Sequence, residues 1–385
     1  MKILIGADIV PTKSNEKAFI QSDTSSLVDA GLLKILQKAD YRVFNLEVPL
    51  TDQERPIAKC GPNLIAPAAS VKGIKALGAD FLTLANNHIM DQGVNGLHDT
   101  IRMLEQQGIA YAGVGDTLEQ AAKSYILERD GLKVGFYCCA EHEFSIVTEK
   151  NPGANPFDPL WSLDHIQELK KDCEFVVVLY HGGKEHYRYP SPELQKVCRR
   201  IADKGADLVI CQHSHCIGCK EEWNHATIVY GQGNFLFDEE DNEYWATSLL
   251  VSVDLQKNNT KIEFVPLCKN GSKIELANEN RKKEIISDFN KRSREILEKD
   301  FIQHKYNEFA DSMLMSYCTR SLGKVSRSLI FRVLNKVSAG NLKKKCYTTS
   351  DVLCLINEME CEPHRELFIR GLQNTIINKK AGKTK

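Results

Sequence analysis

Polar residues of the types that bind metal ions follow several short apolar runs of the sequence. The six are Asp8 after KILIG, Glu47 after YRVFNL, Asn87 after FLTLA, His181 after FVVVLY, and His213 and His215 after LVICQ. Carboxylate and amide oxygens combined with imidazole nitrogens suit Mn, Fe or Zn better than Ca or Mg. A single histidine or aspartate after a strand is more often a structural or capping residue. The metal hypothesis therefore depends on the coincidence of all six.

A second set of metal-ligand residues lies within CQHSHCIGC, residues 211–219. Cys216 and Cys219 have the C-x-x-C spacing of a zinc knuckle. A structural zinc site normally takes four ligands from two such pairs, and no second pair lies nearby in the sequence. A self-contained knuckle is therefore the weaker alternative, and the remaining cysteines are interpreted as small core residues.

The apolar runs predict buried β-strands. They are short, rich in β-branched and aromatic residues, and continuously apolar, as in strands covered on both faces. The runs are 2–6, 41–47, 81–86, 133–139, 175–180, 208–212 and 227–231. In an open α/β sheet the carboxyl ends of parallel strands share one edge, and ligands bind there. We therefore expect the six residues to meet at one such edge.

Helical patterns separate several of these runs. The segments 70–77, 96–107 and 191–204 each precede a glycine, as expected for a helix that ends in a left-handed C-cap. Strands alternating with helices predict a layered α/β fold with much parallel pairing. Residues 248–267 differ, because two alternating runs flank a polar Asn-Asn turn, which predicts a β-hairpin.

The pattern changes near residue 272, beyond which the sequence has a helical period and few strand signals. We therefore predict two parts, an α/β domain over 1–271 and a helical domain or cap over 272–385. The second part ends in a basic tail, NKKAGKTK.

Composition excludes several classes of protein. The 385 residues carry a formal net charge of −1, which gives no support to electrostatic binding of nucleic acid. No apolar run approaches the roughly 18 residues of a membrane span. Asp8 interrupts the first apolar run before it reaches signal-peptide length. Thirteen scattered cysteines favour reduced thiols, so we expect a cytoplasmic protein without a membrane span.

The motifs that contain the six residues resemble those of the CapA, or bacterial capsule synthesis (PGA_cap), family. That family is similar to the calcineurin-like metallophosphoesterases. The matching segments, over roughly residues 1–270, are IGADIV (5–10), NLEVPLTD (45–52), LTLANNHIMDQG (82–93), YAGVG (111–115), LYHGGKEHYRYPSPELQ (179–195), GADLVICQHSHC (205–216) and VYGQGNFLFD (229–238). The resemblance implies a metallophosphatase-like sandwich of largely buried strands flanked by helices, with a helical C-terminal extension.

The same resemblance implies a role for each matched residue. Asp8 and His215 would bind a first divalent ion, Glu47 would bridge two ions, and Asn87, His181 and His213 would bind the second. His88 would donate a proton or stabilise charge, oriented by Asp91. Residues expected to line the substrate pocket are Asn86, Lys184, Glu185, Arg188 and Asn234. Phosphoesterases of this fold usually begin D-x-H, whereas Val10 stands at the third position here.

A pair of divalent ions, Mn, Fe or Zn, would support hydrolysis of phosphoester or amide bonds. The family implies a link to capsule, poly-γ-glutamate or polysaccharide synthesis. Its substrate would be a small molecule, a peptide or an anionic polymer, with capsule-synthesis proteins as partners. Two alternatives stay open, since fold does not fix function: a capsule-assembly factor without hydrolytic activity, and a metal-dependent peptide epimerase.

Overall fold

The computed structural model describes residues 1–238, 242–257, 259–321, 328–338, 341–342, 346, 349–360, 364–365, 367–369 and 371–372. By internal contacts the chain forms two compact units, Met1–Gln303 and His304–Lys385, and each is described by itself. The first unit contains every residue of the predicted site.

The first sheet has eight strands in the order β16-β15-β14-β1-β2-β3-β4, with β13 also paired to β1. Strands β1 to β4 are parallel, whereas β14, β15 and β16 are antiparallel. Their bounds are β1 (Lys2–Ile9), β2 (Tyr41–Leu46), β3 (Phe81–Thr83), β4 (Ala110–Ala112), β13 (Asn234–Leu236), β14 (Thr247–Gln256), β15 (Asn259–Asn270) and β16 (Lys273–Leu276). The predicted hairpin is confirmed as β14 and β15.

The second sheet has six strands in the order β11-β12-β10-β9-β7-β6. Its four central strands are parallel and the two edge strands are antiparallel. The bounds are β6 (Tyr125–Arg129), β7 (Leu132–Ala140), β9 (Phe175–His181), β10 (Leu208–Gln212), β11 (Lys220–Trp223) and β12 (Ala226–Tyr230). Short strands β5 (Val114–Gly115) and β8 (Gly153–Ala154) form a separate pair.

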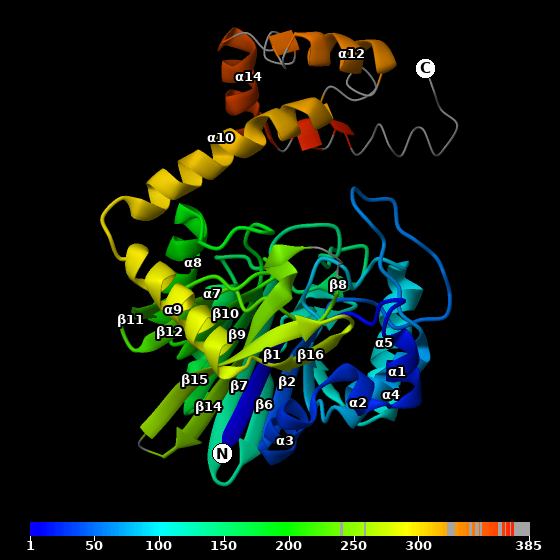
Figure 1. The fold of residues 1–385 in the computed structure, drawn as a ribbon, viewed down its shortest axis with the longest axis vertical. Coiled ribbons are helices and arrows are strands. Elements are labelled where there is room, and N and C mark those ends of the chain that lie inside the picture. Colours follow the sequence, from blue (N-terminus) through cyan, green and yellow to red (C-terminus); the bar gives the residue numbers. More distant parts are fainter. Residues whose placement is uncertain are drawn as a thin grey trace. The chain divides into compact units, whose positions relative to one another are not determined.

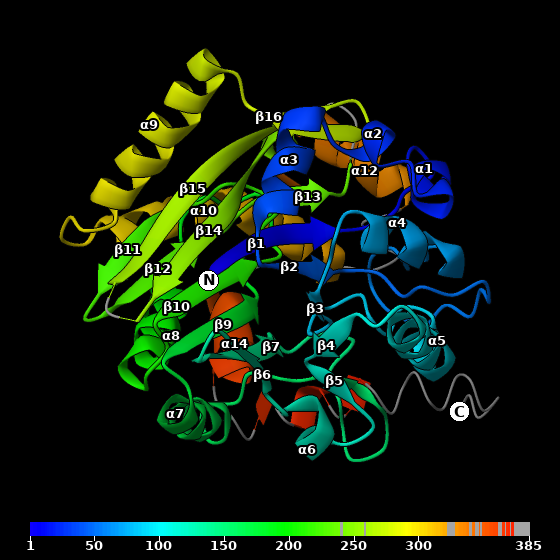
Figure 2. The same ribbon diagram turned by 90° about the horizontal axis from the view of Figure 1, so that it is seen from below.

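The two sheets pack face to face around a shared core (Figure 2). Ile3 and Val43 of the first sheet belong to the same buried cluster as Phe136, Val177 and Ile210 of the second. Two further clusters cover the outer faces of the sheets, beneath helices. Strands covered on both faces need apolar residues on both sides, which explains the continuous apolar runs.

Helices flank the sandwich on both outer faces (Figures 1 and 2). The three predicted helices are confirmed as α4 (Val71–Ala76), α5 (Gly93–Gln106) and α8 (Pro192–Asp203), and the glycine after each has a positive φ. Other helices of the first unit are α1 (Glu16–Gln21), α2 (Thr24–Leu27), α3 (Ala30–Lys38), α6 (Leu118–Ala121), α7 (Ser162–Asp172) and α9 (Glu279–Glu295), with 3-10 turns η1 (Ala68–Ser70) and η2 (Glu243–Ala246).

The expectation of a single sheet edge is wrong. Asp8, which lies inside β1 rather than after it, and Glu47, after β2, belong to the first sheet. His181, the last residue of β9, and His213, after β10, belong to the second. These side chains still converge, because the parallel strands of both stacked sheets end on the same side of the sandwich. Strand periodicity cannot reveal this, since it does not say which sheet a strand joins.

The C-terminal segment is largely helical, as predicted, but it begins with strand β16. Helix α9 packs against β15 through Phe264 and Phe289, whose ring centroids lie 4.9 Å apart, and so belongs to the first unit. Beyond it come α10 (Phe301–Ser321), α12 (Leu329–Val337) and α14 (Thr349–Glu360). Among the described helices, none has the length and apolar content to cross a bilayer. The domain boundary expected at residue 271 stays a prediction.

Candidate metal centre

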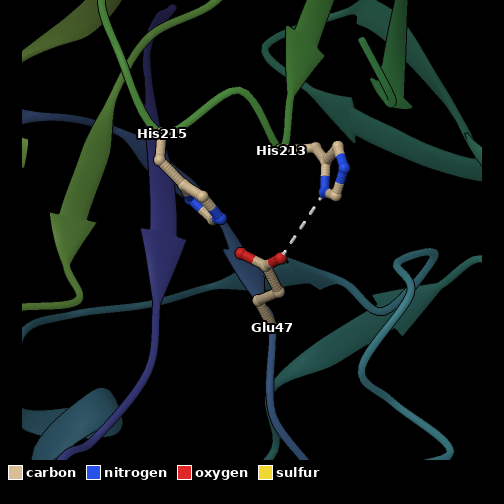
Figure 3. A group of neighbouring side chains, drawn as sticks. All are labelled: Glu47, His213 and His215. Atoms are coloured by element: carbon tan, nitrogen blue, oxygen red, sulfur yellow. Dashed lines mark ion pairs between the residues drawn. The ribbon is translucent and has the colours of Figure 1, made fainter. Parts of the chain in front are cut away.

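Glu47 lies at the centre of the site, directly after β2. Its side chain is fully buried, and neither carboxylate oxygen accepts a hydrogen bond. His181 Nε2 lies 3.3 Å and His213 Nδ1 4.0 Å from Glu47 Oε1. The imidazoles of His213 and His215 lie beside this carboxylate (Figure 3). Ligand atoms of these two histidines and Glu47 all fall within 4.8 Å of one another.

A strained turn after β10 presents the two histidines. His213 has φ = 87° and His215 has φ = 53°, in the left-handed region that residues other than glycine rarely adopt. Each such residue costs on the order of 1–3 kcal/mol. Gly231, with φ = 118°, passes close behind, where a Cβ would meet Ser214 Oγ at 2.7 Å. Both the strain and the close packing fix the direction of the two imidazoles.

Asp8 and Asn234 hold His215 from the first sheet. The two residues are register partners in the parallel pair β1 and β13. His215 Nδ1 donates to Asn234 Oδ1 at 2.9 Å and lies 3.5 Å from Asp8 Oδ2. Val10 is buried in the hydrophobic core, so it adds no ligand where the D-x-H pattern has a histidine.

Asn87 and His181 form the opposite end of the cluster. His181 Nε2 lies 3.0 Å from Asn87 Oδ1. The buried Asn45 links the two ends, because its Nδ2 donates to Asp8 Oδ1 at 2.8 Å and lies 3.2 Å from His181 Nδ1. The sequence reasoning missed Asn45, although it opens the matched N-L-E segment.

Asn86 is fully buried and hydrogen-bonded within the protein. Its Nδ2 donates to Asn45 Oδ1 and to the Leu46 carbonyl, and its Oδ1 accepts from the backbone N–H groups of His88 and Ile89. These bonds shape the loop that carries Asn87. The structure thus gives Asn86 a positioning contact, and its contact with substrate stays a prediction.

The electrostatics of the cluster couple Glu47 to the histidines. Burial alone would raise the pKa of the Glu47 carboxyl, but the charges of His181 and His215 outweigh it and hold that pKa well below its usual value. Burial alone would lower the pKa of His215, but Glu47 and Asp8 outweigh it and raise that pKa to about 9. The Glu47 carboxylate therefore stays ionised and attracts positive charge into the site.

The residues present fit a bound cation. Buried polar atoms without a hydrogen-bond partner include Asp8 Oδ2, both Glu47 oxygens and His213 Nδ1. Leaving such a group unpaired costs about 1–3 kcal/mol, and more when it is charged. All four atoms belong to ligand types that bind Mn, Fe or Zn, and a cation among them would remove this cost.

A buried lysine accompanies the predicted proton donor. His88 Nδ1 lies 2.6 Å from Asp91 Oδ2, as expected for a donor oriented by a carboxylate. Lys59, whose side chain is 2% exposed, forms an ion pair with Asp91 and lies 3.2 Å from His88 Nδ1. Asp91 Oδ2 also accepts from Leu64 N at 2.6 Å. Sequence reasoning missed Lys59, because a lone lysine in a loop carries no recognisable signal.

The loop after β9 carries three residues that were expected to contact substrate. Glu185 is exposed and Lys184 is partly buried. Arg188 donates to the Ile217 carbonyl at 3.1 Å, and its guanidinium lies 4.9 Å from the Tyr244 ring centroid. Arg188 thus braces the loop, and a substrate role for these three residues stays a prediction.

Aromatic side chains cover His215, a feature that the sequence did not predict. The ring centroid of Trp245 lies 4.8 Å and that of Phe237 5.4 Å from the His215 ring. Trp245 Nε1 donates to His186 Nε2 at 2.9 Å, and His186 N donates to the Ser214 carbonyl at 2.9 Å. These contacts exclude water from one side of the cluster.

The zinc-knuckle alternative gains no support. Cys216 and Cys219 are both fully buried, and Cys219 belongs to the hydrophobic core. Burial raises the pKa of the Cys216 thiol to about 11, so it stays protonated. Within the described part of the chain, neither cysteine lies in a group of three or more potential ligands.

Comparisons with known proteins agree with the arrangement of motifs. The family described as "Bacterial capsule synthesis protein PGA_cap" matches residues 2–239. The "PGA biosynthesis protein CapA" of Bacillus subtilis (strain 168) is 31% identical over 269 residues, which cover 68% of this chain and 69% of that protein. The "Capsule biosynthesis protein CapA" of Bacillus anthracis is 30% identical, covering 60% of this chain and 59% of that protein.

Solved structures show a weaker similarity. A structure described as a novel phosphatase, from Mycoplasma pneumoniae, is 13% identical, with a TM-score of 0.45 over 70% of this chain and 94% of that one. A putative 5'-nucleotidase of Staphylococcus aureus is 16% identical, with a TM-score of 0.45 over 75% of this chain and 58% of that one.

Proposed function

The chain belongs to the bacterial capsule synthesis protein PGA_cap family, and from this premise we propose that it is a metal-dependent hydrolase of phosphoester or amide bonds. Its physiological role would lie in the synthesis of a capsule or poly-γ-glutamate polymer. One observation carries the proposal: the buried Glu47 carboxylate has no hydrogen-bond donor and lies among three imidazoles.

The proposed site would hold two divalent cations. Glu47 would be shared between them, Asp8 and His215 would complete the first set of ligands, and Asn87, His181 and His213 would complete the second. When bound, such a pair supplies Lewis-acid polarisation of the scissile bond and activation of a water molecule.

Side chains of the protein itself would transfer the proton to the leaving group of the substrate. His88 is partly exposed, with 12% of its side chain accessible, so its ring can reach a leaving group. Asp91 accepts the Nδ1 proton of this imidazole and leaves Nε2 directed away from the carboxylate. A histidine held in this way is suited to protonating a departing oxygen or nitrogen.

Metal analysis of the full-length chain, purified without a chelator or histidine tag, tests the site. We expect about two transition-metal ions per chain after Mn or Zn is supplied, as a two-metal site requires. His213→Ala should lower that number, whereas the matched control, Cys216→Ser with Cys219→Ser, should not. Less than one ion per chain in the wild type after supplementation would overturn the metal site.

Activity assays separate the two bond types. An aryl phosphate and a γ-glutamyl anilide are suitable probes, because each releases a coloured product. We expect metal-dependent release from one of them, lost in His88→Asn at unchanged metal content. A metal-loaded protein that hydrolyses neither probe would contradict the hydrolase and favour the assembly-factor alternative.

A further inference from the structure

Charge is divided unevenly between the two units of the chain. The unit His304–Lys385 has fifteen Lys and Arg against seven Asp and Glu, a formal charge of +8. Since the whole chain carries −1, the unit Met1–Gln303 carries −9. The family match ends at residue 239, so it does not account for the basic unit. The C-terminal unit is thus strongly basic although the net charge of the whole chain is close to zero.

Helix α12 in this basic unit presents large apolar side chains to solvent. The five are Leu329 and Ile330, each 74% exposed, Val333 at 52%, Leu334 at 53% and Val337 at 81%. At 100° per residue they fall within an arc of about 140° and form one continuous face, here called the α12 stripe. Contiguous exposed apolar surface of this kind marks an interaction site.

The other residues of α12 also fit a helix whose apolar stripe faces solvent. Phe331, outside this arc of the helix, is only 8% exposed. Arg332 and Lys336 follow one another at i and i+4, and helical geometry places both along one border of the stripe. An apolar face bordered by basic residues is the pattern of a helix that lies in a lipid interface.

We propose that the α12 stripe docks on an anionic lipid surface. The apolar side chains would enter the boundary between headgroups and acyl chains, while Arg332 and Lys336 and the unit's net charge of +8 are attracted to lipid phosphates. A soluble polyanion would match the charge but leave the apolar stripe uncovered. A second copy of the unit would cover the stripe but bring two basic surfaces together. Anionic lipid satisfies both features, and the proposal is independent of the hydrolase activity.

Co-sedimentation of the full-length chain with lipid vesicles tests the docking. The probes are phosphatidylcholine vesicles and vesicles of equal parts phosphatidylcholine and phosphatidylglycerol. We expect about tenfold stronger binding to the anionic vesicles, weakened by salt. The double change Ile330→Asp with Val337→Asp should reduce this binding at least about tenfold. The matched control is Leu160→Asp, at an equally exposed leucine of the other unit, and should leave it unchanged.

Circular dichroism and a thermal melt will show that the variants fold, since all three positions are exposed. Arg332→Glu with Lys336→Glu provides a second variant pair and should also weaken binding. The proposal would be overturned if the wild-type chain does not bind anionic vesicles. It would also be overturned if the stripe variant, Ile330→Asp with Val337→Asp, binds them as strongly as the wild type. If the wild type and the stripe variant both bind free poly-γ-glutamate tightly, the chain would instead carry a polyanion site. If the wild-type chain is a dimer and the stripe variant is a monomer, the stripe would instead be a contact between two copies of the chain.

Discussion

The two ends of the metal centre differ in how completely the protein satisfies its own polar atoms. At the end called the Asp8 side, Asp8 Oδ1 accepts from Asn45 and His215 donates to Asn234, which leaves Asp8 Oδ2 without a partner. At the end called the His213 side, His213 Nδ1 makes no hydrogen bond. Glu47, the proposed bridging residue, has no hydrogen-bond donor for either oxygen.

This difference predicts unequal affinity for two cations. On the Asp8 side, Val10 replaces a potential ligand, and Asp8 Oδ2 is the one atom of Asp8 and His215 that is buried without a hydrogen-bond partner. On the His213 side, three further ligands surround an unsatisfied carboxylate, so a cation relieves more unpaired charge there. We therefore expect the His213 side to bind the tighter ion and the Asp8 side the weaker one.

The largest effect is expected for Glu47→Gln, because both sides share this carboxylate. The change keeps the volume and removes the negative charge, so affinity for both ions should fall by about a hundredfold or more. Titration of the metal-free protein with Mn, followed by calorimetry, measures both steps. Retention of one step at wild-type affinity would show that Glu47 does not bridge.

A pair of single changes distinguishes the two sides. His213→Ala should remove the tighter step of the titration and leave the weaker, while Asp8→Asn should remove the weaker step and leave the tighter. His213→Ala removes one ligand and Asp8→Asn removes the charge of one ligand, each on one side only, at an expected loss of about tenfold to a hundredfold in affinity. The opposite pattern would reverse the order of the sides, and loss of both steps in each variant would mean that the ions bind only together.

The next effect concerns Lys59, which contacts neither side of the centre directly. Lys59→Met leaves Asp91 as a buried carboxylate without its ion-pair partner, so the free energy of unfolding should fall by about 3 kcal/mol. Adding Asp91→Asn should recover part of this loss. Denaturant unfolding of the single and double variants provides the measurement. Equal stability of Lys59→Met and wild type would show that the ion pair has no structural role.

The smallest effect is expected for Asn234→Ala. Asn234 orients His215 through a single hydrogen bond, so its loss should weaken the Asp8-side step by about tenfold and spare the other. Asn234→Asp, which keeps an acceptor at this position, should restore the weaker step. An unchanged titration of Asn234→Ala would show that the turn after β10 alone fixes the His215 ring.

Local sequence identified the buried central strands of both sheets, the β14–β15 hairpin, three of the flanking helices and all six proposed ligands. Continuous apolar runs predicted the buried strands, because burial on both faces demands apolar residues at every position. Glycines at 78, 108 and 205 predicted helix ends, because each takes a positive φ. The proposed ligands were recognisable because each lies at or within a few residues of the carboxyl end of a strand and has a side chain of a metal-binding type.

Sequence did not identify the residues that support these ligands. Asn45 lies inside a strand, Lys59 in an irregular loop and Trp245 in a short 3-10 turn. None has a type or spacing that signals chemistry on its own. Their roles arise from contacts with residues far away in the chain, such as Lys59 with Asp91 and Trp245 with His186.

The sequence by itself thus determined which buried strands carry the candidate ligands and which ions those side chains suit, because local hydrophobic pattern and residue type fix both. Only the tertiary structure decided that these strands belong to two sheets, that Glu47 lies unpaired among three histidines, and that β16 and α9 complete the first unit. The physical reason is that strand pairing and sheet stacking depend on contacts between segments distant in the chain. A local sequence pattern does not specify such contacts.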